Sequence, residues 1–197
     1  MTIPVSDISI PEAKNLFDIN VWGHIAMTQA FLSLLVKSKG MIVNQTSCAS
    51  IAAIPFASIY SASKAAMAMF SNTMRLELQA FDITVVELKT GVVQSNLIHN
   101  QKENKELSLP EDSIYAPARE LVVKAMRQDD FEGVGTRSQQ WAELVVQDLL
   151  KNSPPPVIWR GEQAMLVRIG TLLPFGMLDG TIKKMTGLDK IEEKVKN

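Results

Sequence analysis

The amino-acid sequence predicts an α/β fold, in which helices pack on a parallel β-sheet. The chain has 197 residues, which is enough for one domain of ordinary size and too short for two full ones. Hydrophobic residues make up 46% and charged residues 21%, so the chain can bury a core and is neither disordered nor fibrous. Helical and strand patterns follow one another in the order helix, strand, helix, strand, helix, helix, strand, which is typical of parallel sheets.

A long helix is predicted over residues 9–36. Ser9 is a candidate N-cap, Pro11 suits a first helical turn, and apolar residues then recur at spacings of three and four over a wide arc. Basic residues in the last turn and Gly40 are expected to end this helix. The next segment, residues 41–47, is short, partly β-branched and bounded by glycine, so it is the first predicted strand.

A second unit of helix and strand follows in the chain. Residues 48–58 are small and apolar with Pro55 as a breaker, and they predict a loop. Residues 59–80 are rich in alanine and methionine and predict a helix. Residues 83–88 predict the second strand, and Gly91 marks the turn after it.

The next part of the chain is less regular. Residues 92–116 are polar, a length and composition typical of a functional loop or lid, and His99 within them is a candidate for contacting a ligand. Residues 117–127 and 136–152 predict two further helices, and residues 157–159 predict a third strand.

The chain is expected to divide near its C-terminus. Residues 1–165 are predicted to form the α/β domain, and residues 166–197 to form an apolar and charged tail.

Composition disfavours several classes of function. The formal net charge of -1 gives no basic surplus for binding nucleic acid. The single cysteine, Cys48, cannot form an internal disulfide or a thiolate zinc site, and no other metal site is predicted. The N-terminus lacks the pattern of a signal peptide, and no apolar run reaches the roughly 18 residues of a transmembrane helix. We therefore expect a cytoplasmic protein that is soluble or bound peripherally to a membrane.

One pair of side chains has catalytic potential. Tyr60 and Lys64 are four residues apart at the start of a predicted helix, so they share one face. An ammonium near a phenol lowers the tyrosine pKa, and such a tyrosine can exchange a proton with an alcohol or a developing alkoxide. An exposed surface pair of no function has the same spacing, so the pair alone leaves both interpretations open.

Two more residues stand in register with this pair. Ser47 lies thirteen residues before Tyr60, and Asn20 lies twenty-seven residues before Ser47. This set resembles the short-chain dehydrogenase/reductase family, and the likeness runs from about residue 5 to residue 165. The resemblance implies the C-terminal part of a doubly wound, Rossmann-type parallel sheet with flanking helices. It is carried by the segments Asp18-Ile19-Asn20-Val21-Trp22-Gly23, Ile42-Val43-Asn44-Gln45-Thr46-Ser47 and Tyr60-Ser61-Ala62-Ser63-Lys64-Ala65-Ala66.

The resemblance implies a catalytic role for each of the four residues. Tyr60 is the general acid/base, and Lys64 lowers the pKa of Tyr60 and holds the nicotinamide ribose. Ser47 binds the carbonyl or hydroxyl oxygen of the substrate. Asn20 holds a water that connects Lys64 to solvent. Hydride transfer itself belongs to the nicotinamide cofactor.

The resemblance also implies three residues that bind the cofactor, in addition to Tyr60 and Lys64. The family usually has Pro-Gly after the second strand of this chain, where Thr90 and Gly91 stand, and Gly91 can still make the sharp turn. Val93 would offer backbone groups to the nicotinamide carboxamide, and Ser95 would bind the cofactor through its hydroxyl. The cofactor is expected to be NADP, with NAD as the alternative.

The family's glycine-rich phosphate loop is absent from the sequence. Gly23 is the only glycine before Gly40, so no backbone cradle for a pyrophosphate precedes Asn20. We expect the chain to lack the cofactor-binding N-terminal third of a full enzyme and its first strand to have an unpaired edge. The alternatives are an active reductase and a catalytically impaired chain that acts only by associating with a partner.

Residues 143–161 are similar to a fungal branch of the family that contains NADPH-dependent 1-acyldihydroxyacetone phosphate reductases of lipid metabolism. The substrate is accordingly expected to be a small carbonyl compound or alcohol, either a lipid of this kind or an intermediate of fungal secondary metabolism. The resemblance implies a homo-oligomer for the full-length protein, and a location at the cytosolic face of the endoplasmic reticulum or a lipid droplet. Residues 165–178 are the candidate membrane contact, with an apolar lid or a dimer contact as the alternatives.

Overall fold

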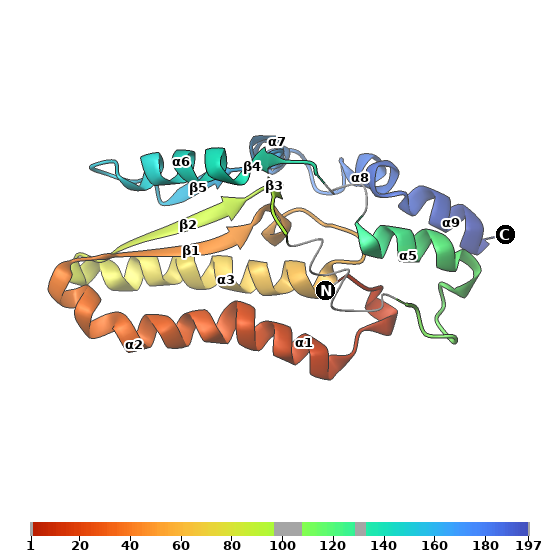
Figure 1. The fold of residues 1–197 in the computed structure, drawn as a ribbon, viewed down its shortest axis with the longest axis horizontal. Helices are drawn as coiled ribbons and strands as arrows, with labels where there is room; N and C mark the ends of the chain where they lie inside the picture. Colours follow the sequence, from red (N-terminus) through yellow and green to blue (C-terminus); the bar gives the residue numbers. More distant parts are fainter. Residues whose placement is uncertain (1, 97–107, 129–132, 197) are drawn as a thin grey trace.

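The described part of the chain is built around a three-stranded parallel sheet. A computed structural model describes residues 2–96, 108–128 and 133–196. The strands β1 (Met41–Ser47), β2 (Thr84–Thr90) and β5 (Val157–Arg160) lie in the order β1-β2-β5 (Figure 1). Both pairings are parallel, and the first begins with Met41 opposite Thr84. The predicted α/β class with a parallel sheet is therefore confirmed.

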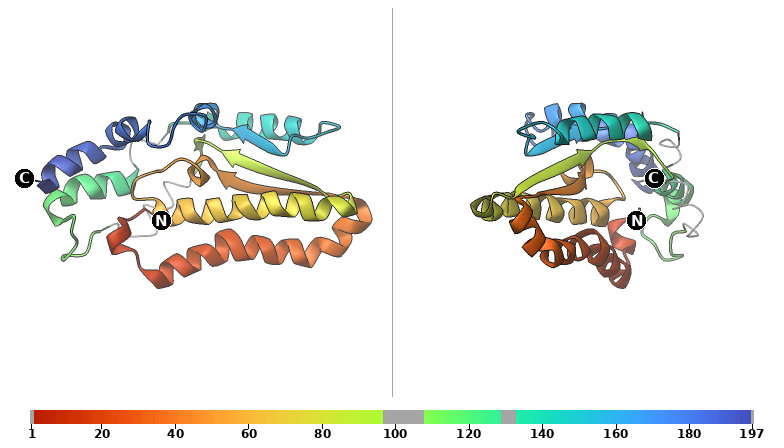
Figure 2. Two further views of the ribbon diagram at one scale, coloured as in Figure 1. Left: turned by 180° about the vertical axis from the view of Figure 1, so that it is seen from behind. Right: turned by 60° about the vertical axis from the view of Figure 1, so that its left-hand side comes forward.

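One face of the sheet is covered by α3 (Ser58–Glu77). Behind α3 lies a long helical segment that contains α1 (Ile10–Phe17) and α2 (Gly23–Ser38), as Figures 1 and 2 show. The apolar side chains of α3, β1 and β2 form one core cluster, and half-buried residues of α2 pack against it. The buried members of the cluster are Ile42, Met67, Met74, Ile83 and Val85.

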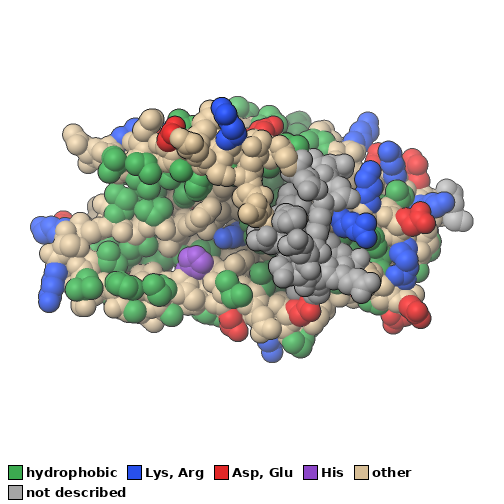
Figure 3. Space-filling view, viewed as in Figure 1, with side chains coloured by type: hydrophobic (Ala, Val, Ile, Leu, Met, Phe, Trp, Pro, Cys, Tyr) green, Lys and Arg blue, Asp and Glu red, His purple; other side chains and the backbone are tan. Residues whose placement is uncertain are grey.

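The other face is covered by α6 (Ser138–Leu149) over β2 and β5. Val145 of α6 packs on Val86, Leu88 and Ile158. Helices therefore flank the sheet on both sides, as a doubly wound arrangement requires. Within the described residues β1 is an edge strand. Figure 3 shows exposed apolar side chains on the left of the molecule, where the strands and α2 lie.

A buried carboxylate fastens α6 to the neighbouring strand. Asp148 accepts hydrogen bonds from Arg160 Nε of β5 at 2.7 Å and from Lys151 Nζ at 2.6 Å. Burial acts to raise the pKa of Asp148, but the hydrogen bonds and charges of these two cations hold it below its ordinary value. Asp148 is therefore ionised at neutral pH and orders the end of α6 against the sheet.

The long N-terminal helix contains a local irregularity. It starts as predicted, with the Ser9 side chain accepting from the Glu12 amide and Pro11 in the first turn. Between α1 and α2 the residues Asp18–Trp22 form a π-helical segment. The helix ends at Ser38, and Lys39 rather than Gly40 adopts the left-handed conformation that stops it, at φ 50°.

This helical segment also corrects an expectation about membrane spans. The π-helical segment joins two helices into one, Ile10–Ser38, whose 29 residues are long and apolar enough to cross a membrane. Length and composition alone are weak evidence, because helices packed in soluble proteins pass the same test. Ile25, Leu32 and Leu35 of this segment pack against the core cluster of α3 and the sheet.

Small elements surround the carboxyl ends of the strands. They are the short strands β3 (Val93–Gln94) and β4 (Thr136–Arg137), and the helices α5 (Arg119–Arg127), α7 (Ala164–Gly170), α8 (Asp179–Thr186) and α9 (Leu188–Lys196). Ile191 of α9 is buried in a cluster with Phe56, Val122 and Met126, so part of the predicted tail packs in a core. Residues 97–107 of the predicted loop, His99 among them, lie outside the described residues.

Candidate active site

Ser47 and Tyr60 meet at the carboxyl end of β1, where ligands bind in open parallel sheets. Ser47 is the last residue of β1, and its Oγ accepts a hydrogen bond from the Ala49 amide at 3.1 Å. Tyr60 lies in the first turn of α3, with its phenol close enough to the Ser47 side chain for Ser47 to act on the phenol pKa. The loop between β1 and α3 therefore brings together two hydroxyls that are thirteen residues apart in sequence.

Lys64 stands one helical turn after Tyr60 on the same side of α3. Its Nζ donates a hydrogen bond to the Gln45 carbonyl at 3.1 Å and lies 6.0 Å from the centroid of the Tyr60 ring. Burial lowers the pKa of Lys64. The pair therefore faces the end of β1 instead of lying on an outer surface of α3.

The effect of Lys64 on Tyr60 differs from the expectation. The pKa of Tyr60 is raised above its ordinary value, chiefly because burial penalises the phenolate, and the nearby Cys48 adds to the rise. The Ser47 side chain acts in the opposite direction but does not offset burial. The predicted lowering by Lys64 is therefore wrong for this structure. The Lys64 ammonium makes its hydrogen bond to the Gln45 carbonyl and lies 6.0 Å from the ring centroid, and its charge is not among the causes of the shift.

Asn20 reaches the same helix through another side chain. It lies in the π-helical segment, and its Nδ2 donates to Ser63 Oγ at 3.0 Å. The Ser63 hydroxyl in turn donates to the Tyr60 carbonyl at 2.7 Å. Asn20 is thus bonded through Ser63 to the turn of α3 that carries Tyr60 and Lys64. Its place in a π-helical segment agrees with a functional site, because such segments often occur there. Ser63 was not predicted as a site residue, because its only sequence signal is a serine inside the Tyr60–Lys64 segment.

Gly91 lies where the chain leaves β2, and the structure corrects the reason for a glycine there. Its φ is not positive, so the position does not depend on the special turn conformations of glycine. A Cβ at this position would lie 2.2 Å from the Glu162 carbonyl oxygen and 3.0 Å from the Ala164 nitrogen. The glycine allows the segment after β5 to approach, and the Gly91 amide donates to the Arg160 carbonyl at 2.9 Å.

Val93 and Ser95 follow on the same side of the sheet. Val93 lies in β3, which pairs with β4. The Thr136 amide of β4 donates a hydrogen bond to the Val92 carbonyl at 3.1 Å, so this amide does not occupy the Val93 carbonyl. Ser95 is exposed just beyond β3. The structure therefore places both residues near the carboxyl end of β2, and their proposed contacts with a cofactor stay predictions.

The donors present fit one end of a nicotinamide nucleotide. The Lys64 ammonium has three N–H donors, of which the Gln45 carbonyl takes one, and ribose hydroxyls are suitable acceptors for the others. No glycine-rich turn precedes Asn20 in the sequence, where the family would offer backbone amides to a pyrophosphate. Lys64, with Tyr60 beside it, is thus suited to the ribose end of such a cofactor.

Cys48 adjoins the site but lacks the properties of a nucleophile. Its thiol is buried, and burial raises its pKa to about 11. The thiolate is therefore scarce at neutral pH, as expected for a structural cysteine. Among the described residues no group of three or more His, Cys, Asp or Glu side chains could hold a metal ion.

A buried ion pair next to the site was not anticipated. Lys89 Nζ lies 2.5 Å from Glu87 Oε1, and the Thr46 hydroxyl donates to the same oxygen at 2.8 Å. Lys89 also donates to Ser50 Oγ at 3.1 Å, in the turn that follows Ser47. The sequence does contain a signal for this ion pair. Side chains alternate between the two faces of a strand, so residues 87 and 89 of β2 share one face with residue 85. The ion pair therefore supports the loop on which the site is built.

The fold and the site define an α/β protein with a parallel sheet, in which a tyrosine and a lysine one helical turn apart stand at the carboxyl end of the first strand. A family model described as "short chain dehydrogenase" matches residues 1–106. The chain is 54% identical over 195 residues to the short-chain dehydrogenase/reductase GME11361 of Pestalotiopsis microspora, and the match covers 99% of this chain and 67% of the relative. The chain belongs to the short-chain dehydrogenase/reductase family.

Other relatives agree with this assignment. The chain is 30% identical to the NADPH-dependent 1-acyldihydroxyacetone phosphate reductase of Saccharomyces cerevisiae, over all of this chain and 65% of the relative. Among solved structures, a short-chain dehydrogenase from Streptomyces avermitilis matches with a TM-score of 0.68 at 22% identity, over 98% of this chain and 65% of that one. A short-chain dehydrogenase from Burkholderia cenocepacia in complex with NADP matches with a TM-score of 0.67 at 20% identity, over 92% of this chain and 65% of that one. The chain thus spans about two thirds of the length of the proteins that it matches.

Proposed function

We propose that this chain carries the proton-transferring half of an NADP-dependent oxidoreductase that interconverts a carbonyl compound and an alcohol. The observation that supports this most directly is the convergence of Ser47, Tyr60 and Lys64 at the carboxyl end of β1, with Asn20 bonded to the same turn of α3. A bound nicotinamide would supply the hydride to the carbonyl carbon in reduction, or accept it in oxidation.

The side chains divide the rest of the chemistry among them. Tyr60 donates its phenolic proton to the carbonyl oxygen as negative charge develops there, and the Ser47 hydroxyl donates a hydrogen bond to the same oxygen. Lys64 holds ribose hydroxyls. Asn20 positions the turn of α3 through Ser63, and a water bound there would return a proton to Tyr60. A raised pKa suits this direction, because a protonated phenol is the species that an acid catalyst needs.

The names of two matched proteins support NADP over NAD. The Saccharomyces cerevisiae relative is named as NADPH-dependent, and the Burkholderia cenocepacia structure contains NADP. We propose NADP for this chain on that basis, with NAD as the alternative. Acyldihydroxyacetone phosphate is supported by the name of a relative that is only 30% identical, whereas the 54% identical Pestalotiopsis relative is named without a substrate. We therefore propose the alternative substrate class, an intermediate of fungal secondary metabolism.

The experiment that tests this function is a chimera. The part of the Pestalotiopsis relative that lies outside the match is joined to this chain, and NADPH oxidation is followed with a panel of ketones and aldehydes. Turnover that depends on the carbonyl compound is the expected result. A folded chimera that binds NADPH but reduces no member of the panel would contradict the proposal.

A second function, association with a partner chain without catalysis, is favoured by uncovered surface. Within the described residues β1 has an open edge, and edges of this kind pair readily with another strand. Met27, Phe31 and Leu34 form an exposed apolar stripe on α2. The chimera separates the two functions, because association alone predicts no turnover. A homo-oligomer also stays a prediction, which the mass of the chimera in solution tests.

The pKa of Tyr60 gives a prediction that needs no turnover. In the cofactor-free chain, burial should move the titration of Tyr60 above the ordinary phenol pKa of about 10. The ultraviolet absorbance of tyrosinate measures it, and Tyr60→Phe isolates the contribution of Tyr115, the other tyrosine. A Tyr60 titration below that of a free phenol would show that Lys64 dominates after all.

The candidate membrane segment, residues 165–178, exposes its apolar side chains. Phe175 is fully exposed at 108%, and Leu172 is 83% exposed. Arg168 lies in the same segment, where its charge can stay at the headgroups while its neighbours enter the apolar layer. We propose that this segment contacts the cytosolic surface of a membrane, such as the endoplasmic reticulum or a lipid droplet.

Flotation with phosphatidylcholine and phosphatidylserine vesicles tests the membrane proposal. The unmodified chain should float with the vesicles. Replacing both Leu172 and Phe175 by serine should lower binding at least about tenfold, because two large apolar side chains leave the interface. Phe81→Ser, which removes an exposed phenylalanine after α3, is the control and should float unchanged. Equal loss for both variants would contradict a contact at residues 165–178.

A further inference from the structure

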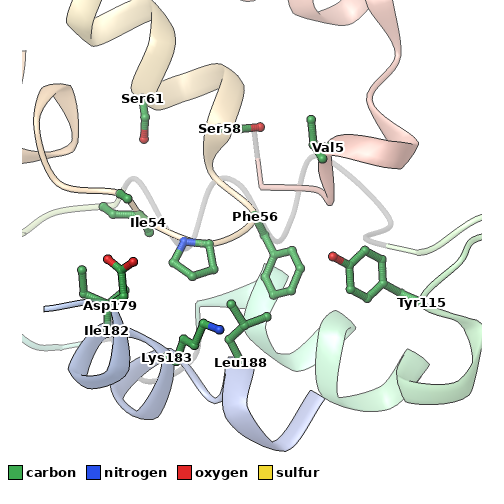
Figure 4. Close-up of a pocket in the computed structure, with 12 residues that line it drawn as sticks. Val5, Ile54, Phe56, Ser58, Ser61, Tyr115, Asp179, Ile182, Lys183 and Leu188 are labelled. Atoms are coloured by element: carbon green, nitrogen blue, oxygen red, sulfur yellow. The ribbon is translucent and has the colours of Figure 1, made fainter. Parts of the chain in front are cut away.

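A pocket of about 520 Å³ lies beside the N-terminus of α3. Its walls are the loop that precedes α3 on one side and the helices α8 and α9 on the other, with Tyr115 closing the end (Figure 4). Ser61 lines the pocket, and it directly follows Tyr60, at about 100° around the helix. The pocket therefore borders the face of α3 that carries the proposed proton donor.

Most of the pocket wall is apolar and is built from segments distant in sequence. Ile54 and Phe56 face Ile182 of α8 and Leu188 of α9 across it. Phe56 is held in the left-handed backbone region at φ 63°, which is unfavourable for an aromatic residue. Its ring makes an edge contact with Tyr115, with 5.8 Å between centroids. The loop thus holds Phe56 in a strained conformation in which its ring forms part of the apolar wall.

One polar atom in this wall has no partner. The Ser61 Oγ is buried and makes no hydrogen bond to any described residue, and Figure 4 shows it directed toward the loop that carries Ile54. A hydroxyl in that state is satisfied by a ligand oxygen or by water. The pocket therefore offers a largely apolar surface with one unsatisfied buried hydroxyl, Ser61 Oγ, next to Tyr60 in the chain.

The charges at the rim disfavour an anionic ligand. Lys183 lines the pocket, but its Nζ is paired with Glu192 Oε1 at 2.5 Å. Asp179 lines the same side. Lys183 is thus the only cation in the described lining and it is neutralised, whereas the Asp179 carboxylate would repel a phosphate or carboxylate.

We propose that this pocket binds the apolar part of a neutral carbonyl compound or alcohol, with Ser61 bonded to one of its oxygens. The inference rests on the proposed function, for which it names the substrate class: an uncharged, largely apolar molecule and not a phosphate ester. The C-terminal helices α8 and α9 then act as the wall that selects the substrate, and Ser61 joins the pocket to the turn of α3 that carries Tyr60.

A cysteine placed in the wall reports occupancy without any turnover. Cys48→Ala removes the single native thiol, and Ile182→Cys adds one inside the pocket, whose reaction rate with N-ethylmaleimide is measured. At a concentration about ten times its dissociation constant, 2-decanone should slow this reaction about tenfold, because the fraction of chains with an empty pocket falls in that proportion. Decanoate, an anion of the same chain length, should slow it little. Adding Ser61→Ala should weaken the protection by 2-decanone about fivefold through the lost hydrogen bond.

The control is Met185→Cys, which lies on the exposed side of the same helix and outside the pocket. Its reaction should be unaffected by 2-decanone. Equal slowing at both positions, equal protection by decanoate, or no protection at all would overturn the proposal. Leu188→Cys reports the same wall if Ile182→Cys unfolds the chain. Because neither cofactor nor catalysis is involved, these outcomes are independent of whether Tyr60 transfers a proton.

Discussion

Tyr60→Phe should lower carbonyl reduction by the chimera about 10²–10⁴-fold, the range that a positioned general acid contributes. Phenylalanine keeps the ring but removes the proton that the carbonyl oxygen must receive. The Ser47 hydroxyl, which lies beside the phenol, remains to bind the substrate but cannot replace a phenol as an acid. The measurement is kcat/KM for NADPH-dependent reduction, with the dissociation constant of NADPH determined in parallel.

The same variant series tests whether the side chains act as one unit. Lys64→Met should also lower kcat/KM, and the double variant should be little worse than Tyr60→Phe alone, because residues that serve one step are strongly non-additive. Unchanged NADPH binding and an unchanged melting temperature for Tyr60→Phe would assign its loss to the chemical step. A chimera that keeps its rate after Tyr60→Phe would contradict the role given to the phenol.

The fold could be predicted because its signals are local. Strands β1, β2 and β5 are short apolar runs bounded by glycine, aspartate or proline, and the helices between them repeat apolar residues with helical spacing. The site could be located because Asn20, Ser47, Tyr60 and Lys64 keep a characteristic spacing. Three of these residues lie at an element end or in the first two turns of a helix, so the topology decides where they meet.

Other features depend on contacts that no local pattern contains. The π-helical segment at Asp18–Trp22 changes the hydrogen-bonding register of a helix without any proline or glycine inside it. The requirement for Gly91 comes from Glu162, seventy-one positions later in the chain. The raised pKa of Tyr60 comes from burial, whereas the sequence shows only that a lysine follows one turn later. In each case the decisive neighbour is set by tertiary packing.

The site and the pocket also depend on one loop. Residues 48–57 begin with the turn that Lys89 supports through Ser50, and they end with Phe56 in the pocket wall. The segment is short and apolar, and its sequence predicts only that it is irregular. Its conformation is therefore fixed by what lies beneath it, and the ion pair of Lys89 and Glu87 is the polar part of that support.

Lys89→Met should lower the free energy of unfolding by about 3–5 kcal/mol, the usual cost of leaving one member of a buried ion pair without its partner. The side chains of Lys89 and Glu87 are only 7% and 2% exposed, and Glu87 Oε2 already lacks a hydrogen bond to any described residue. Removing the ammonium leaves Thr46 as the one donor to a buried carboxylate. Urea unfolding of the chain measures the change.

The double variant Lys89→Met, Glu87→Leu separates an unpaired charge from a loss of packing. Two apolar side chains of similar size need no counter-charge, so the double variant should be more stable than Lys89→Met alone. Lys39→Met breaks the exposed pair with Asp82, whose atoms are 2.8 Å apart, and should have little measurable effect because solvent already screens both charges. If the two single variants are equally stable, or if the double variant is the least stable of all, the buried pair does not support the loop by its charge. In that case the strained conformation of Phe56 must be held by the apolar contacts of the pocket wall alone.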